Sequence, residues 1–181
     1  METASLAMGD QTTPPTQILE FRDIYEQHSE TVYYAALRIT GNPTDAEDVL
    51  QTVFLRLLDR EHALDAALSP SAYLRRAAAN AAIDLLRRKK TRRESDIDGQ
   101  AEHRPGLHAV PDGAREETFA LKERLRAALT RLSPENAELF VLRHLEGYSY
   151  DELAAMLNVE RGTIGSRLHR IRAALQKDLS R

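Results

Sequence analysis

One cluster of polar and basic side chains has the residue types and the spacing to neutralise phosphates. It lies in the segment NAAIDLLRRKK, where four residues follow one another at intervals of four, three and one: Asn80, Asp84, Arg87 and Arg88. On a helix of 3.6 residues per turn, this spacing brings an amide, a carboxylate and two guanidiniums to one face. Guanidiniums neutralise phosphates, and amides and carboxylates bond base edges. With Lys89 beside it, this cluster predicts that this face can neutralise phosphates.

A second cluster lies near the end of the chain. Residues 161–181 contain six Lys or Arg and a single acid, Asp178. Four apolar residues are spaced four, three and four, which predicts a buried helical stripe: Ile164, Leu168, Ile171 and Leu175. The side chains away from that stripe are of the kinds that meet base edges and phosphates: Arg161, Thr163, Ser166, Arg167, His169 and Arg170. A helical hairpin with a merely solvated basic face is the alternative for this segment taken alone.

The second cluster needs a helix that presents it, and the residues before it supply one. Ser149 and Glu152 have the S-x-x-E spacing of a capping box, so a helix is expected to begin near Tyr150. Asn158 tolerates the left-handed backbone that a tight turn requires, and a further helix is expected to start around Glu160. The segment from Ser149 to Leu175 therefore predicts a helix-turn-helix.

The first cluster is expected on the third of three earlier helices. Apolar periodicity predicts a helix from Ile18 to Ile39, and Gly41 stops it. Thr44 with Glu47 has capping-box spacing and predicts the start of the next helix. That helix, residues 45–58, is expected to leave outward Asp45, Asp48, Gln51, Thr52 and Arg56. Ser69 and Pro70 suit the start of the third helix, and Ser133 and Pro134 suit the start of a later one.

The composition excludes several functional classes. The chain has 181 residues, a net charge of −3 and no cysteine, so disulfides and cysteine-bound zinc are excluded. The histidines lack metal-ligand spacing, and no nucleophile–base arrangement or phosphate loop is present, so we expect no metal, no cofactor and no enzyme activity. No segment is apolar enough to span a membrane and no signal peptide is recognisable, so we expect a cytoplasmic protein without membrane insertion.

Charge and composition divide the chain into parts. Residues 18–66 hold ten acids against four basic side chains, whereas residues 87–93 form a basic run. We expect a disordered tail over residues 1–17, a helical domain over 18–95, a flexible linker over 96–117 and a second helical domain over 118–181. The expected fold is all-α, with two small helical domains joined by the linker.

These motifs together resemble the sigma factors of bacterial RNA polymerase, in particular the two-domain extracytoplasmic-function (ECF) group. The resemblance covers about residues 18–95 and 118–181. DAEDVLQTVFLRLL resembles the helix by which that family binds core polymerase, and NAAIDLLRRKK resembles its minus-ten segment. The stretch from Leu132 to Arg172 resembles its minus-thirty-five domain. Three motifs in the family's order are more specific than any one of them.

The resemblance implies a role for each surface. Polymerase would be met by Asp45, Glu47, Asp48 and Gln51, and the melted minus-ten strand by Asn80, Asp84, Arg87, Arg88 and Lys89. The loop before the third helix, residues 59–68, would capture a flipped base. The helix-turn-helix would contact the minus-thirty-five duplex, and an anti-sigma factor would hold the chain inactive.

Three positions depart from the family pattern, and two other functions stay open. Thr52 stands where an acid is common, Gly165 where Lys or Arg is usual, and Tyr73 where a tryptophan is common. A two-domain DNA-binding regulator would use the same surfaces without polymerase and would bind duplex tightly by itself. A helical adaptor, kept soluble by its basic faces, would show no dependence on DNA.

Overall fold

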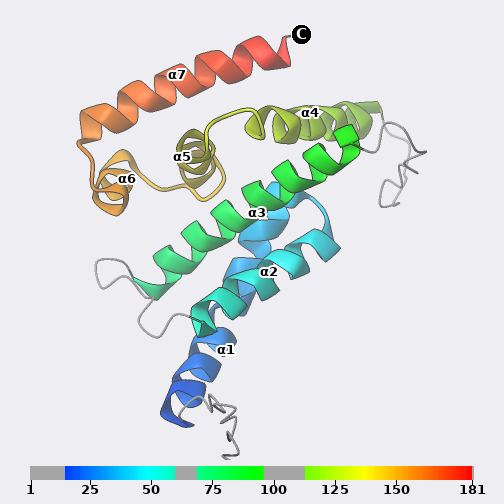
Figure 1. The fold of residues 1–181 in the computed structure, drawn as a ribbon. Coiled ribbons are helices and arrows are strands. Elements are labelled where there is room, and N and C mark those ends of the chain that lie inside the picture. Colours follow the sequence, from blue (N-terminus) through cyan, green and yellow to red (C-terminus); the bar gives the residue numbers. More distant parts are fainter. Residues whose placement is uncertain (1–14, 60–68, 96–112, 181) are drawn as a thin grey trace, which may run out of the picture.

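The computed structural model describes residues 15–59, 69–95 and 113–180, and within these ranges the chain forms helices and no strand (Figure 1). The all-α fold expected from the sequence is confirmed. In chain order the helices are α1 (Pro15–Thr40), α2 (Pro43–Leu58), α3 (Pro70–Ser95), α4 (Gly113–Leu129), α5 (Pro134–His144), α6 (Tyr150–Leu157) and α7 (Arg161–Leu179). We call α1–α3 the first bundle and α4–α7 the second bundle.

Most helix ends follow the local signals in the sequence. The Ser69 hydroxyl accepts the Ala72 amide at 3.2 Å at the start of α3, and the Ser133 hydroxyl caps α5. At α6 both bonds of the expected capping box are present: the Ser149 amide donates to Glu152 at 2.7 Å, and the Glu152 amide donates back to the Ser149 hydroxyl at 3.2 Å. These starts were predicted because each satisfies backbone donors that the first helical turn leaves unpaired.

The start of α2 differs from the prediction. Thr44 was expected to cap this helix, but the cap is Asn42, whose side-chain oxygen accepts the Asp45 amide at 3.2 Å. Pro43 then occupies the first helical position, where its fixed φ and missing N–H cost nothing. Asn42 and Thr44 both have a side-chain oxygen that can accept a backbone amide, but only Asn42 is followed by proline. The helix therefore begins two residues earlier than predicted.

Two other helices also begin before the predicted boundaries. α1 starts at Pro15 inside the expected tail, and α4 starts at Gly113 inside the expected linker. Proline is favoured at the first helical position, and the residues after Gly113 include Ala, Arg and Glu, which are strong helix formers. Most of the expected tail and linker, and nearly all of the loop before α3, lie outside the described residues.

The two bundles pack against each other, with α3 between them. α3 contacts α1 and α2 on one side and α4 and α5 on the other (Figure 1). The buried apolar residues of both bundles form one cluster, including Leu74 of α3, Leu139 of α5 and Ile164 of α7. A helix buried on more than one side is apolar over most of its surface, and the middle of α3 is rich in alanine accordingly.

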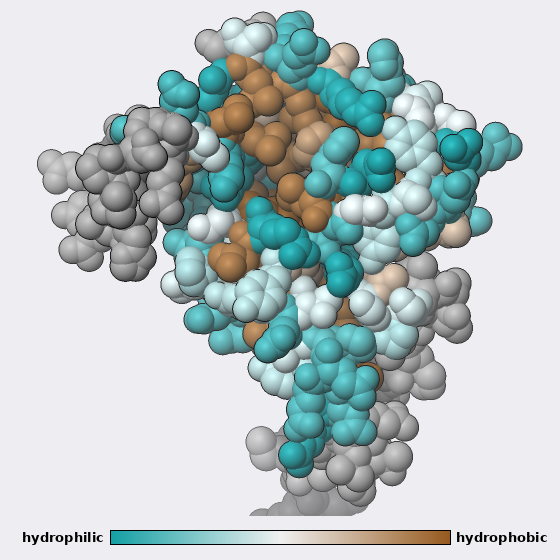
Figure 2. Space-filling model, turned by 180° about the vertical axis from the view of Figure 1, so that it is seen from behind, coloured by the Kyte–Doolittle hydropathy of each residue, from teal (hydrophilic) through white to brown (hydrophobic). Residues whose placement is uncertain are grey.

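The surface of the molecule is mixed. Figure 2 shows hydrophilic side chains over most of the reverse face and one apolar patch in its upper half, the half where α4 and α7 lie in Figure 1. α4 exposes two large apolar residues, Phe119 and Leu121, by about half of their area each, 54% and 52%. Each helix in the described ranges is too short or too polar to cross a bilayer.

Candidate nucleic-acid interface

α7 carries the second cluster on the face opposite its buried stripe. Ile164, Leu168, Ile171 and Leu175 are all buried, as the spacing predicted. The polar residues expected to point away from that stripe are exposed at Arg161, Ser166, His169 and Arg170 and half-buried at Thr163 and Arg167. Burial of the apolar stripe fixes the rotation of α7 about its axis, and this decides which side chains point outward.

The turn before α7 fixes the angle at which α7 leaves α6. Asn158 has the expected left-handed backbone, with φ 50° and ψ 50°, and its amide bonds the carbonyls at the end of α6. Tyr150 of α6 then ties the two helices together: its hydroxyl accepts a bond from Arg172 at 3.1 Å, and its ring lies 5.2 Å from the Arg143 guanidinium. The arrangement is a helix-turn-helix whose second helix is α7.

The first cluster keeps most of its members together on α3. Arg87 lies 3.7 Å from the Asp84 carboxylate, and the Arg88 guanidinium donates to the Asp84 carbonyl at 3.4 Å. Asn80 lies one turn earlier, half-buried, and donates to the Glu138 carboxylate of α5 at 3.1 Å. Three of the four side chains are thus adjacent, and Asn80 is engaged by the second bundle.

Lys89 and Asp45 do not lie where the sequence placed them. The expectation that Asp45 points outward is wrong: it is 7% exposed and pairs with the Lys89 ammonium. The cause is helical phase, because Asp45 lies four residues before Val49 and so falls on the buried stripe of α2. Lys89 therefore reaches α2 and joins α3 to the start of that helix.

The rest of the outward face of α2 agrees with the prediction. Glu47, Asp48 and Gln51 are exposed, and Thr52 donates its hydroxyl to the Asp48 carbonyl at 2.7 Å. Beside them Leu55 and Leu58 are exposed by 60% and 44%. This face combines acids with exposed leucines, which is suited to a protein partner with basic and apolar groups.

A cleft lies beside the basic face of α7. Its lining includes Ser133 and Glu135 at the start of α5 and Arg167 and Arg170 of α7. The backbone amide of Glu135 and the Ser133 hydroxyl, followed by the charges of Arg87 and Arg167, hold the pKa of the Glu135 carboxyl below its usual value. Basic groups from both bundles therefore come near one exposed carboxylate.

The acids that join the bundles, chiefly Glu138 and Glu146, were not predicted from the sequence. Glu138 is 8% exposed and bonds Arg76 at 2.5 Å as well as Asn80. A signal existed, because Glu138 falls on the same helical stripe as Leu142 and Leu145, and an acid on an apolar stripe implies a buried polar partner. The described side chains contain no group of three or more potential metal ligands.

Comparison with known proteins gives matches over both bundles. The family model for sigma-70 region 2 matches residues 24–92, and the model for sigma-70 region 4 matches residues 122–175. The chain is 32% identical to the ECF RNA polymerase sigma factor SigE of Mycolicibacterium smegmatis over 175 residues, covering 97% of this chain and 66% of that protein. It is 31% identical to the RNA polymerase sigma-E factor of Streptomyces coelicolor, covering 90% of this chain and 88% of that protein.

A solved structure has a similar fold. It is the sigma factor RpoE of Bartonella quintana in complex with the anti-sigma factor NepR, with a TM-score of 0.51 and 24% identity. The match covers 89% of this chain and 97% of that one.

Two all-helical bundles, one of them ending in a helix-turn-helix with a basic outer face, define a DNA-binding protein. With the matches to both sigma-70 regions, the chain belongs to the ECF sigma factors of RNA polymerase. Its function is that of the family, promoter-specific transcription initiation by RNA polymerase, and the resemblance seen in the sequence is confirmed. Sigma factors are regulatory proteins rather than enzymes.

Proposed function

We propose that the outer face of α7 binds the minus-thirty-five duplex. The single observation that supports this most strongly is that the buried stripe of α7 leaves polar and basic side chains facing outward. Short hydroxyl side chains bond base edges, and arginines clamp phosphates or bond guanine. The residues proposed for this contact are Arg161, Thr163, Ser166, Arg167, His169 and Arg170.

α3, in this proposal, holds the opened minus-ten strand through Asn80, Asp84, Arg87 and Arg88. The Asp84 carboxylate lies 3.7 Å from Arg87 and its carbonyl accepts from Arg88, so both guanidiniums lie near Asp84 on α3. Lys89 contributes positive charge but is committed to Asp45, so its effect on DNA is weaker than that of the arginines. Capture of a flipped base by the loop before α3 falls almost wholly outside the described residues.

Core polymerase binds, in this proposal, to the outward face of α2. Glu47, Asp48 and Gln51 are exposed there beside Leu55 and Leu58. Asp45 has a different part, because it is buried and fixes the start of α2 against α3. A charge-complementary partner surface would therefore lose affinity when Asp48 is neutralised.

The division into parts follows from these surfaces. Residues 18–95 would act as the region 2 domain and 118–181 as the region 4 domain, with 96–117 spanning the distance between two promoter elements. We further propose that the chain is not an enzyme, that it acts in the cytoplasm with polymerase, and that an anti-sigma factor restrains it. The last point is supported by family membership and by the solved relative, which is bound to its anti-sigma factor.

Transcription from a promoter library tests this assignment. Core polymerase is assayed with and without the chain, and transcript starts are sequenced. New starts that share two upstream motifs are expected with the wild-type chain, and Arg87→Ala with Arg88→Ala should abolish them. Arg22→Ala is the matched control, because Arg22 is an exposed arginine of α1 that pairs with Glu26 at 2.8 Å and lies outside the proposed surfaces.

The outcome also separates the remaining alternatives. Starts that depend on the chain but survive loss of both arginines would refute the minus-ten assignment. Tight duplex binding by the free chain, without any new start, would instead indicate a regulator that acts apart from polymerase. A helical adaptor would show neither new starts nor DNA binding.

A further inference from the structure

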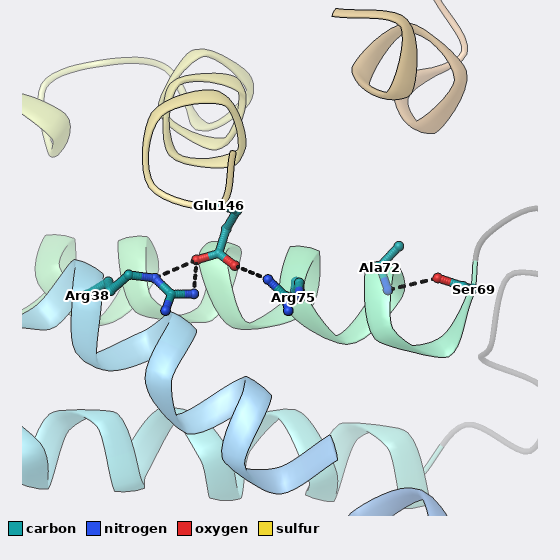
Figure 3. A network of polar contacts seen from close by, with 5 residues as sticks. All are labelled: Arg38, Ser69, Ala72, Arg75 and Glu146. Carbon is teal, nitrogen blue, oxygen red and sulfur yellow. Dashed lines mark hydrogen bonds and ion pairs between the residues drawn. The ribbon is translucent and has the colours of Figure 1, made fainter. Parts of the chain in front are cut away.

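The contact between the bundles is built around a buried carboxylate, Glu146, which follows the end of α5. Figure 3 shows it between two arginines of the first bundle. Its oxygens lie 2.7 Å from Arg38 of α1 and 3.2 Å from Arg75 of α3, and its side chain is completely buried. A buried carboxylate needs such partners, because removing it from water is otherwise very costly.

A second carboxylate, Glu138, makes the same kind of contact farther along α3. It accepts from Arg76 at 2.5 Å and from Asn80 at 3.1 Å, and its side chain is 10% exposed. Every buried side-chain nitrogen or oxygen in the described residues has a hydrogen-bond partner, so neither acid leaves a buried oxygen unpaired in this arrangement. We call Glu138, Glu146 and the arginines that pair with them the interbundle clasp.

Two arginines complete the contact through backbone carbonyls. Arg126 of α4 donates to the Ile39 carbonyl at 2.9 Å, at the negative end of the α1 dipole. It fits there because Gly41 has no side chain: a Cβ would lie 1.9 Å from an Arg126 nitrogen. In the other direction, Arg87 of α3 donates to the Leu132 carbonyl at 2.8 Å.

Two of these contacts use side chains that the proposed function gives to the minus-ten strand, Asn80 and Arg87. In the packed arrangement the Glu138 carboxylate and the Leu132 carbonyl stand where phosphate or base acceptors of DNA would have to bind. The second bundle and the opened strand therefore compete for the same donors.

We propose that the free chain is self-inhibited by the interbundle clasp. By holding the bundles together, the clasp keeps Asn80 bound to Glu138 and Arg87 bound to the Leu132 carbonyl until the bundles separate. This rests on the proposed minus-ten role of α3. The affinity of the free chain for DNA is then its intrinsic affinity reduced by the small fraction of open molecules. A partner that binds only the separated bundles, as polymerase spanning two promoter elements must, removes the inhibition by mass action.

Energy transfer between two labels tests the clasp directly. The chain has no cysteine, so Glu30→Cys on α1 and Gln176→Cys on α7, both at exposed positions, carry unique labels. Glu138→Gln with Glu146→Gln keeps the shapes and removes the charges, and should lower the transfer. The same variant should bind single-stranded DNA of random sequence about tenfold more tightly if the fraction of open molecules rises about tenfold. The reason is that the apparent affinity is proportional to the fraction of molecules that are open.

Two controls make the result specific. Glu116→Gln with Glu117→Gln removes the same charge from exposed positions on α4 and should leave the energy transfer unchanged. It should raise DNA affinity only slightly, through the general loss of negative charge. The charge exchange Arg76→Glu with Glu138→Arg rebuilds one pair and should restore transfer relative to Glu138→Arg alone. It also separates loss of the clasp from loss of folding.

Two results would overturn the proposal. One is a transfer signal in the Glu138→Gln, Glu146→Gln variant equal to that of the control. The other is a fall in transfer with no greater gain in DNA affinity than the control shows, which would mean that the contact masks nothing. Because transfer is read without DNA or polymerase, the clasp is tested even if the transcription experiment contradicts the sigma-factor surfaces.

Discussion

Gly165 in the middle of α7 offers a sharp test of how the second bundle is built. Its backbone is helical, and a Cβ added there would lie 3.8 Å from the Tyr150 ring, an ordinary contact distance. Glycine in a helix interior costs about 0.5–1 kcal/mol relative to alanine because it loses more backbone freedom on folding. Gly165→Ala should therefore stabilise the chain by that amount, raising its melting temperature by about 1–4 °C.

Gly162→Ala is the matched control in the same helix. A Cβ at Gly162 would meet nothing within 4 Å, but this residue lies in the first turn, where helix propensity counts for less. Thermal unfolding followed by circular dichroism should show a clear gain for Gly165→Ala and a smaller one for Gly162→Ala. A fall in melting temperature at position 165 alone would refute the reasoning, since it would mean that α7 needs a flexible point there.

Three further changes have definite expected outcomes. Ser149→Ala removes one bond of the α6 capping box and should cost about 1 kcal/mol in chemical unfolding, with Ser180→Ala as a neutral comparison. Lys89→Met leaves the Asp45 carboxylate without its cation; because the Lys89 side chain is 44% exposed, the loss should be about 1–2 kcal/mol, and a neutral result would contradict the pairing. Burial, with the charges of Arg172 and Arg143, lowers the pKa of His144 below 6.5. The unfolded chain therefore binds this proton more readily than the folded chain, and stability falls as the pH drops below 6.5. His144→Gln should reduce the difference between the unfolding midpoints measured at about pH 5.5 and 7.5.

The local structure could be predicted where one signal acted alone. The capping box at Ser149, the serine and proline at the start of α3 and the left-handed Asn158 each leave the backbone one low-energy choice, and each formed as expected. The start of α2 was missed because Asn42 and Thr44 both had credible capping chemistry. The direction of Asp45 was missed for another reason: it lies four residues before Val49, on the buried stripe of α2, where an acid was not expected.

The contact between the bundles could not be predicted in the same way. Glu146 pairs with Arg38, 108 residues away, and Glu138 pairs with Arg76, 62 residues away. No helical period links such positions, and many other arginines could have been chosen. The composition showed that the charges were segregated, but only the packing of α5 on α3 selects the partners.

The alanines of α3 bear on what happens when the bundles separate. Between Arg76 and Ile83 the helix carries only alanine and Asn80, and it packs on both sides. Alanine side chains are small, so this stretch of α3 adds little apolar area to the surface when the bundles part. It also means that a change as small as one methyl group in this stretch can reset how readily the chain opens. The ease with which the bundles separate can thus differ between related chains even when all of their DNA-facing side chains are the same.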